Sequence, residues 1–301
     1  MYSYRLHFML LLPLWLFGQN MVRINALVDR VDSTGRARKY LPREQTPYSG
    51  FVFFNYNNGQ REFEGPLIEG LQEGKWVWWY ANGQKQQEGE FHNTKQDGLW
   101  TRWYANGQKK EEGEFIQGKK EGTWTQWHEN GVISSAEPYK NGLLDGILML
   151  WYPNGTKEGE ADFIQGVKYG RDIGWYDNGK KKWSFHYIRG QEDGPQVEWY
   201  ESGGTRYFHD YKDGKKDGVW KEWYEDGSPR LKGQFSRDKQ VGEWQWSYPD
   251  SMTAIYGTYD ADYPVGEWKV YDSQGQLIAT ESNPTRSWIN NQIREWEKKT
   301  E

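Results

Sequence analysis

Few side chains of this sequence are placed to do chemistry. Five histidines occur, at His7, His92, His128, His186 and His209, and their spacing matches no metal-ligand pattern. The chain has no cysteine, which excludes thiol catalysis, thiolate metal sites and disulfides. Neither a G-x-S-x-G nucleophile motif nor a Walker phosphate loop is present. The sequence therefore predicts no catalytic, cofactor-binding or metal-binding residue, and we expect a protein that is not an enzyme.

Acidic residues recur directly before glycines and form a second candidate group. They are Glu73, Asp97, Glu121, Asp145, Asp193 and Asp217. Regularly spaced carboxylates could hold cations, but aspartate, asparagine and glycine also populate tight turns for backbone reasons. We interpret these acids as turn residues.

The strongest chemical signal is aromatic. The chain has 19 tryptophans, 21 tyrosines and 12 phenylalanines beside 35 glycines. Seven tryptophans recur at one interval, here called the Trp row: Trp79, Trp103, Trp127, Trp151, Trp175, Trp199 and Trp223. Tryptophan is enriched at binding hot spots, so the row is a candidate partner-binding surface. The alternative is that it serves only to build the fold.

The interval of the Trp row belongs to a repeat that runs through most of the chain. Each repeat is aligned here on one glycine, position zero, which usually follows asparagine. Positions zero are Gly59, Gly83, Gly107, Gly131, Gly155, Gly179, Gly203, Gly227, Ser251 and Gly275, and they differ by 24 throughout. Nine residues before each position zero stands another glycine, in all ten repeats. This regularity predicts a repeat architecture.

Each repeat contains two aromatic, strand-like runs separated by turn residues. Asn-Gly between such runs predicts a hairpin with a two-residue type I′ turn, here at Asn82-Gly83 between arms 76–81 and 84–91. The polar link to the next repeat predicts a second turn. We therefore expect an all-β fold, an extended single-layer antiparallel meander of ten 24-residue units, with a short C-terminal helix.

The predicted turn fixes which residues face each other. Trp76 should lie opposite Gly89, a pairing in which a large ring can cover a glycine. This face, with Tyr80 and Phe91, is the more apolar and should be the packed face. On the other face each tryptophan of the Trp row should meet the residue at position +3, as Trp103 meets Lys110, and some of these pairs should be cation–π contacts.

The stretch "GLWTRWYANGQKKEEGEFIQGKKEG" resembles the MORN-repeat variant of bacterial proteins of the YwqK-family antitoxin type. The stretch "TPYSGFVFFNYNNGQREFEG" is similar to that family's usual first unit. The resemblance covers residues 46 to about 281 and implies a meandering β-sheet, with little about activity. A weaker resemblance is to choline- or glucan-binding cell-wall repeats.

The two ends of the chain differ from the repeats. Arg5 and His7 precede an apolar run at 8–17 that is too short to span a bilayer, so residues 1–19 are predicted to be a signal peptide with no lipobox cysteine. Residues 20–45 are a possible degenerate capping unit, and 46–281 form the repeat domain. Residues 282–301 are predicted to be a helix, capped by Asn283, with one apolar stripe that covers the last sheet edge: Trp288, Ile289, Gln292, Ile293 and Trp296.

These observations predict a non-enzymatic repeat scaffold that mediates protein–protein interaction in the cell envelope or outside the cell, secreted or periplasmic. The formal net charge of −5 gives no reason to expect nucleic acid, and no transmembrane span is expected. Alternatives are a glycan-binding module that uses aromatic platforms, or an antitoxin or immunity-type binding protein. Membrane-lipid binding is less favoured, because a polybasic cluster is missing.

Overall fold

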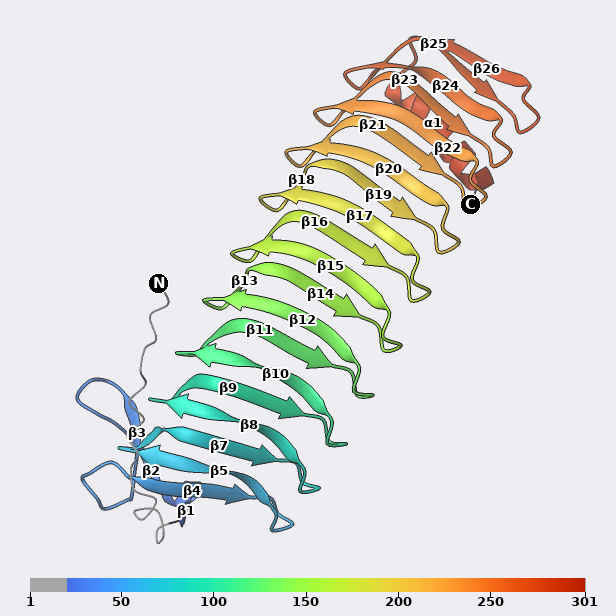
Figure 1. Ribbon diagram of the computed structural model, residues 1–301. Helices are drawn as coiled ribbons and strands as arrows, with labels where there is room; N and C mark the ends of the chain where they lie inside the picture. Colours follow the sequence, from blue (N-terminus) through green and yellow to red (C-terminus); the bar gives the residue numbers. More distant parts are fainter. Residues whose placement is uncertain (1–20, 301) are drawn as a thin grey trace, which may run out of the picture. The chain divides into compact units, whose positions relative to one another are not determined.

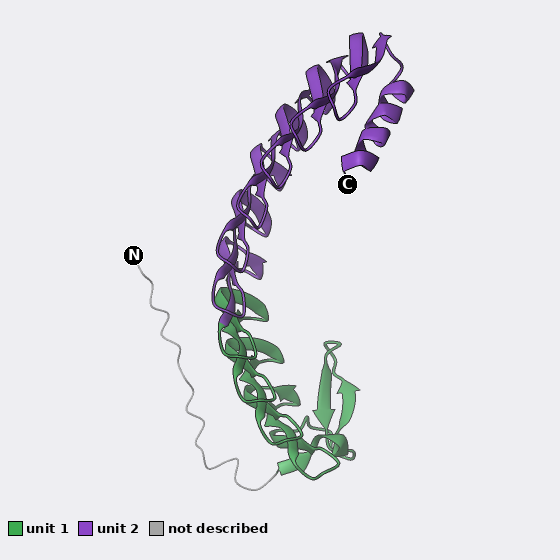
Figure 2. Ribbon diagram, turned by 90° about the vertical axis from the view of Figure 1, so that its right-hand side faces the viewer, with its two compact units in different colours: residues 1–132 green, residues 133–301 purple. Residues whose placement is uncertain are grey.

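The computed structural model describes residues 21–300, so the predicted signal peptide lies outside the described residues. The chain divides into two compact units, residues 1–132 and residues 133–301 (Figure 2). Among the described residues, no helix is long and apolar enough to span a membrane.

Unit 1 is an antiparallel meander with a small hairpin beside it (Figure 1). Strand β1 (Met21–Arg23) pairs in parallel with β4, and the 3-10 helix η2 (Ile24–Ala26) leads into a separate hairpin of β2 (Val28–Val31) and β3 (Ala37–Tyr40). The meander then follows chain order: β4 (Gly50–Asn55), β5 (Arg61–Ile68), β6 (Leu71–Gln72), β7 (Gly74–Trp79), β8 (Lys85–His92), β9 (Lys95–Trp103), β10 (Lys109–Ile116) and β11 (Lys119–Trp127).

Unit 2 continues the same pattern and ends in a helix. Its strands are β12 (Ile133–Lys140), β13 (Leu143–Leu144), β14 (Gly146–Trp151), β15 (Lys157–Ile164), β16 (Val167–Trp175), β17 (Lys181–Ile188), β18 (Gln191–Glu192), β19 (Gly194–Trp199), β20 (Thr205–Lys212), β21 (Lys215–Trp223), β22 (Pro229–Ser236), β23 (Lys239–Ser247), β24 (Thr253–Asp260), β25 (Tyr263–Tyr271) and β26 (Leu277–Ser282). The helix is α1 (Arg286–Thr300). The predicted fold class, an all-β meander of hairpin strands with a C-terminal helix, is confirmed.

The Asn-Gly turns differ from the predicted type. The amide of Gly83 donates to the Tyr80 carbonyl at 2.9 Å, and the amide of Tyr80 donates to the Gln84 carbonyl at 2.8 Å. Gly83 has φ +85°, whereas Asn82 is not in the positive-φ region that a type I′ turn requires of both central residues. The loop is therefore a three-residue turn, type I followed by a left-handed glycine. The prediction of a two-residue type I′ turn here is wrong.

Type I′ geometry occurs instead at the polar links between repeats. Gln117 and Gly118 have φ of +50° and +82°, and the flanking Ile116 and Lys119 pair directly. The predicted second turn is thus present at the polar link, where no turn type was predicted, and type I′ geometry occurs there rather than at Asn-Gly.

The predicted register is nevertheless correct over most of each hairpin. Trp76 pairs with Gly89, and Trp78 pairs with Gln87, but Trp79 pairs with Lys85. Gln86 is therefore the extra residue of a β-bulge. This extra residue compensates for the loop, which is one residue longer than predicted, so the strand pairs beyond the bulge are the predicted ones. The predicted pairing of the Trp row with position +3 is wrong, because row tryptophans pair with position +2, as Trp103 does with Lys109 and Trp175 with Lys181.

On the packed face most tryptophans at position −7 cover a glycine of the preceding repeat, and Trp220 instead covers His209. The ring of Trp100 lies so close to Gly89 that a β-carbon there would be 2.2 Å from Trp100 Cδ2. The indole N–H of Trp100 also donates to the Glu90 carbonyl at 3.0 Å, beside the bulge at which Gly98 takes φ +76°. The covering of glycine by tryptophan is as predicted, but the covered glycine belongs to the neighbouring repeat rather than to the same hairpin.

Helix α1 packs on the face of the last strands. Its buried residues Ile289 and Trp296 join Trp246 and Trp268 in one core, and the Trp296 indole donates to the Ser247 carbonyl at 3.1 Å. The predicted apolar stripe is confirmed, but the expected cover of the sheet edge is wrong (Figure 2).

The cap of α1 also differs from the prediction. The Trp288 amide donates to Thr285 Oγ1 at 3.2 Å, so Thr285 is the N-cap. Asn283 instead accepts the Gly266 amide at 2.8 Å through its side-chain oxygen, which ties the chain to β25 before the helix begins.

Candidate binding surfaces

The Trp row lies on the face opposite the packed face and is half-buried along its whole length. Side-chain bonds to backbone carbonyls join many of the repeats to the next at this place. Tyr80 Oη donates to the Trp103 carbonyl at 2.8 Å, and Asn82 Nδ2 donates to the Ala105 carbonyl at 3.0 Å. The same tyrosine bond joins Tyr152 to Trp175 in unit 2. The backbone that carries the row is therefore held rigidly.

Lysines from the preceding repeat cover several of the rings. In unit 1, Lys85 Nζ lies 5.4 Å from the Trp103 ring centroid and 2.7 Å from Glu88 Oε2. Lys109 stands in the same way over Trp127, at 5.5 Å. In unit 2, Lys157 lies over Trp175 and Lys181 over Trp199, at 4.9 and 5.8 Å. Cation–π contacts are present, as predicted, but they join neighbouring repeats.

The residues at position +3 take a different role. Lys110 Nζ lies 5.4 Å from the ring of Tyr104, and Lys182 Nζ lies 5.2 Å from that of Tyr176. The bulge at this position explains why these lysines contact tyrosines rather than the Trp row, because it moves the +3 side chain away from the row.

Glu88 shows how charge supports this arrangement. It accepts hydrogen bonds from Lys85 at 2.7 Å and lies 3.1 Å from Lys75 Nζ. Partial burial raises the pKa of Glu88, but the hydrogen bonds from Lys85 and Lys75 outweigh it and leave the pKa below its ordinary value. The carboxylate thus stays ionised and keeps Lys85 over Trp103.

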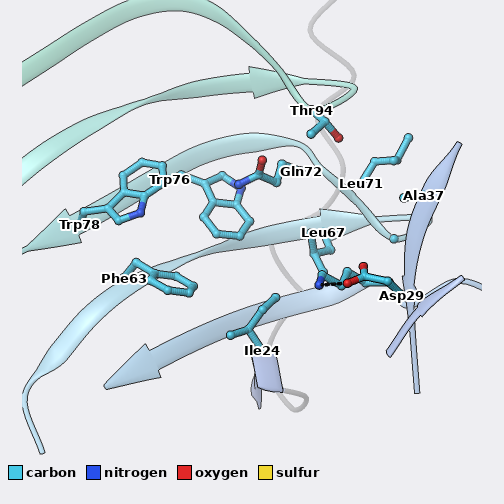
Figure 3. A pocket seen from close by; sticks show the side chains of 12 residues that line it. Ile24, Asp29, Ala37, Phe63, Leu67, Leu71, Gln72, Trp76, Trp78 and Thr94 are labelled. Atoms are coloured by element: carbon cyan, nitrogen blue, oxygen red, sulfur yellow. Dashed lines mark hydrogen bonds and ion pairs between the residues drawn. The ribbon is translucent and has the colours of Figure 1, made fainter. Parts of the chain in front are cut away.

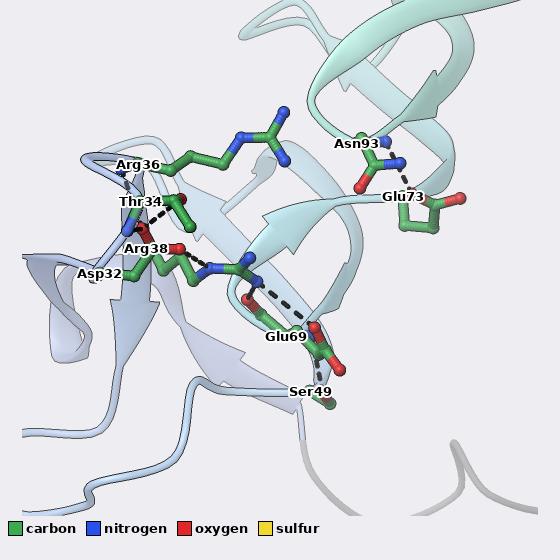
Figure 4. A network of polar contacts seen from close by, with 8 residues as sticks. All are labelled: Asp32, Thr34, Arg36, Arg38, Ser49, Glu69, Glu73 and Asn93. Atoms are coloured by element: carbon green, nitrogen blue, oxygen red, sulfur yellow. Dashed lines mark hydrogen bonds and ion pairs between the residues drawn. The ribbon is translucent and has the colours of Figure 1, made fainter.

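The acidic residues before the glycines serve turns. Glu73 Oε2 accepts the Asn93 amide at 2.8 Å (Figure 4), and Asp97 Oδ1 accepts the Gln117 amide at 3.1 Å. Asp193 accepts a turn amide in the same way in unit 2. These bonds agree with the turn interpretation. Within residues 21–300, no group of three or more histidine, aspartate or glutamate side chains could hold a metal ion.

The histidines have separate surroundings. His92 Nδ1 lies 2.7 Å from Glu73 Oε1, and His186 Nδ1 lies 2.9 Å from the Asp193 carbonyl. The ring of His209 stacks on Trp220, with centroids 3.4 Å apart. His209 occupies the place that glycine holds in other repeats, so its role is packing.

A pocket that the sequence did not predict lies in unit 1 (Figure 3). Its volume is about 370 Å³, and it opens between the β2–β3 hairpin and the packed face. Phe63, Trp76 and Trp78 form its aromatic side, and the ion pair of Lys39 with Asp29, at 2.8 Å, lies beside it. Residues 20–45 gave no signal for it, because only one turn glycine, Gly35, matches the repeat there.

A polar network holds the hairpin in place beside this pocket (Figure 4). Arg38 Nη1 donates to the Glu69 carbonyl at 2.8 Å, and the Lys39 amide donates to the Gly70 carbonyl at 3.1 Å. Arg38 also pairs with Asp32 at 2.6 Å. The hydrogen bonds that Thr34 and Arg38 donate to Asp32 hold the pKa of that carboxyl well below its usual range.

Comparisons with known proteins give one informative result. The family model described as "MORN repeat variant" matches residues 72–93, 96–117, 120–141 and 216–236. These stretches start 24 residues apart or at a multiple of 24, in phase with the repeat. The structural repeats between them keep the same turns and strand pairs.

The other comparisons add little. No curated protein sequence matches the chain. Among solved structures, the chain is similar to one in "Crystal Structure of TcdB2-TccC3-Cdc42", at 11% identity and a TM-score of 0.18, covering 84% of this chain and 17% of that one. This similarity is too low to indicate a shared fold or function. The family match, in phase with the structure, means that the chain carries MORN repeats of the variant type, which are generally protein- or membrane-binding modules.

Proposed function

We propose that this protein is a non-enzymatic repeat scaffold that binds another protein through the Trp row, in the cell envelope or outside the cell. The supporting observation is the fixed geometry of the row. Trp103 is held by the Tyr80 bond to its carbonyl and by Lys85 over its ring. Rings that are already fixed lose little conformational freedom on binding, so more of their contact energy appears as affinity.

Residue type supports the same surface. Tryptophan, tyrosine and arginine dominate binding hot spots, and polar groups around a hot spot exclude water from it. Trp103 and Trp127 are half-buried and flanked by Lys85, Glu88 and Lys109. Location outside the cytoplasm is supported by the predicted signal peptide at 1–19, and sequencing the mature N-terminus would test it. An intact Met1 in the exported protein would contradict it.

Glycan binding is the second candidate function. Aromatic rings at a regular interval are its supporting observation. A sugar stacks on the flat face of a ring, however, and lysines already lie over Trp103, Trp127, Trp175 and Trp199. This occupancy favours a protein partner, which can use ring edges and the surrounding charges. An antitoxin or immunity role would be one case of such protein binding.

The test is capture from the native organism with a matched control. The mature protein, the pair Trp103→Ala with Trp127→Ala, and the pair Leu99→Ala with Ile116→Ala are immobilised in parallel. Leu99 and Ile116 are exposed and lie in β9 and β10, so they control for loss of apolar surface. Circular dichroism and melting temperature confirm that each variant is folded.

The proposal expects a protein that the wild type and the control retain and the tryptophan variant loses. Equal retention by all three folded proteins would contradict a binding role for the row. Retention of the wild type on cell-wall polysaccharide, with no captured protein, would favour the glycan alternative.

A further inference from the structure

The last strand of unit 2 has an open edge. Strand β26 pairs with β25 on one side, with Val270 opposite Ala279 and Lys269 opposite Thr280. All its residues except Ala279 are exposed, and Leu277 and Ile278 are 55% and 56% exposed. A strand edge of this kind presents unpaired N–H and C=O groups to which another strand can add.

Helix α1 leaves that edge uncovered. Its buried residues Ile289 and Trp296 pack with Trp246 and Trp268 on the face of the sheet. Within β26 the protective devices common at edges are sparse: it has neither lysine nor proline, and Glu281 is its one charged residue.

The repeat shows what such an edge accepts. In the preceding repeat, Ile255 and Tyr256 of β24 hold the positions that Ala279 and Thr280 hold in β26. There they pair antiparallel with Val270 and Lys269 of the next strand. The outer edge of β26 therefore has the backbone geometry that, one repeat earlier, receives an antiparallel strand.

A second copy of β26 suits this edge. Two β26 strands related by a two-fold axis at Ala279 place Ile278 opposite Thr280 and Leu277 opposite Glu281. Like charges directly opposite each other destabilise a pair of strands, and this arrangement places none opposite each other. A self-complementary contact of this kind forms a closed dimer.

The first sheet edge of unit 1 is not equally open. Strand β1 already pairs in parallel with β4, with Met21 opposite Phe51 and Arg23 opposite Phe53. The outermost strand there is β1 itself, which has three residues and so offers a shorter edge than the six residues of β26. We propose that β26 is a dimerisation strand, which pairs antiparallel with β26 of a second copy. The contact is short, below the size of standard stable interfaces, so the dimer forms in a concentration-dependent way. This proposal is independent of the Trp row.

Thiol crosslinking tests it cleanly, because the chain has no cysteine. Thr280→Cys places one thiol beside the proposed axis, and Ile164→Cys places one at a control position that is 51% exposed in the internal strand β15. Full-length mature protein is treated with a short bis-maleimide over a range of concentrations. We expect a crosslinked dimer for Thr280→Cys at concentrations at which Ile164→Cys stays monomeric. Equal crosslinking of both, or none of either, would overturn the proposal.

Sedimentation of the cysteine-free protein gives the second arm. The wild type should pass from monomer to dimer as concentration rises. The pair Ile278→Lys with Thr280→Lys should remain monomeric at an unchanged melting temperature, since like charges would then meet across the edge. A wild type that is monomeric throughout, or a lysine variant that still dimerises, would contradict the assignment. Dimerisation should persist in the Trp103→Ala, Trp127→Ala variant, which separates this proposal from the proposed function.

Discussion

The indole ring of Trp100 lies flat on Gly89, one repeat earlier in the chain, and its N–H donates to the Glu90 carbonyl at 3.0 Å. The same contact recurs between Trp76 and Gly65. One side chain thus supplies packing and satisfies a backbone carbonyl between successive repeats. We therefore expect the stability of the sheet to depend on this contact.

Gly89→Ala should therefore destabilise the protein. The added carbon would lie 2.2 Å from Trp100, and overpacking of this kind costs about 1–3 kcal/mol. Gly159→Ala is the matched control, because the nearest atom to a β-carbon there is 3.6 Å away. Urea unfolding measures both. A Gly89→Ala variant as stable as Gly159→Ala would contradict the packing role.

Ser251→Gly should stabilise the protein. Ser251 holds position zero with φ +68° and keeps the turn bonds of the other repeats, with its amide 2.9 Å from the Tyr248 carbonyl. A left-handed non-glycine residue costs about 1 kcal/mol, which glycine avoids. Ser273→Gly, at a turn residue without positive φ, is the control and should give no gain. A fall in melting temperature for Ser251→Gly would contradict the claim that the backbone of Ser251 is strained.

Glu88→Gln should remove a stabilising contribution that depends on pH. The pKa of Glu88 is lowered in the folded state, so its ionised form stabilises the fold above the ordinary glutamate pKa. That contribution is lost as pH falls through the folded pKa. The difference in unfolding free energy between wild type and variant should thus shrink as the pH falls from 7 to below the ordinary glutamate pKa. Glu90→Gln, at an exposed neighbour, is the control, and a difference independent of pH would contradict the assignment.

The Trp296→Ala substitution should make the C-terminal end of unit 2 less stable than it is in the wild type. Trp296 is 4% exposed, and its truncation removes core packing and the bond to Ser247, at a cost of about 3–5 kcal/mol. Hydrogen exchange at β24 and β25 should accelerate most. Trp288→Ala, at a partly buried position on the same helix, should cost less. Equal effects of the two variants would show that α1 docks differently.

The features that could be predicted from the sequence are those that recur from repeat to repeat. The pairing of Trp76 with Gly89 was predicted from the spacing around the Asn-Gly turn, and it is correct because the bulge at Gln86 compensates for the longer loop. The type of the Asn-Gly turn was predicted wrongly, because Asn-Gly also suits a type I turn followed by a left-handed glycine. The bond from Asn82 to Ala105 of the next repeat accompanies the observed turn, and a dipeptide does not reveal such a contact.

The candidate sites were predicted less completely. The Trp row followed from spacing, but its lysine partners did not, since one bulge residue, Gln86, moves the pairing from position +3 to +2. The pocket in unit 1 was missed for a different reason. It depends on contacts such as Arg38 with Glu69, which join segments about thirty residues apart and have no counterpart in the repeat.

The central claim is that the Trp row binds a protein, and the most direct test is the affinity of the captured partner for two folded variants. Calorimetric titration compares Trp103→Ala with Trp127→Ala against the control pair Leu99→Ala with Ile116→Ala. Loss of two hot-spot tryptophans predicts binding weaker by at least about tenfold, or 1.4 kcal/mol, with the control pair close to wild type. Wild-type affinity in the folded tryptophan variant would contradict the claim and assign the row to the structure alone.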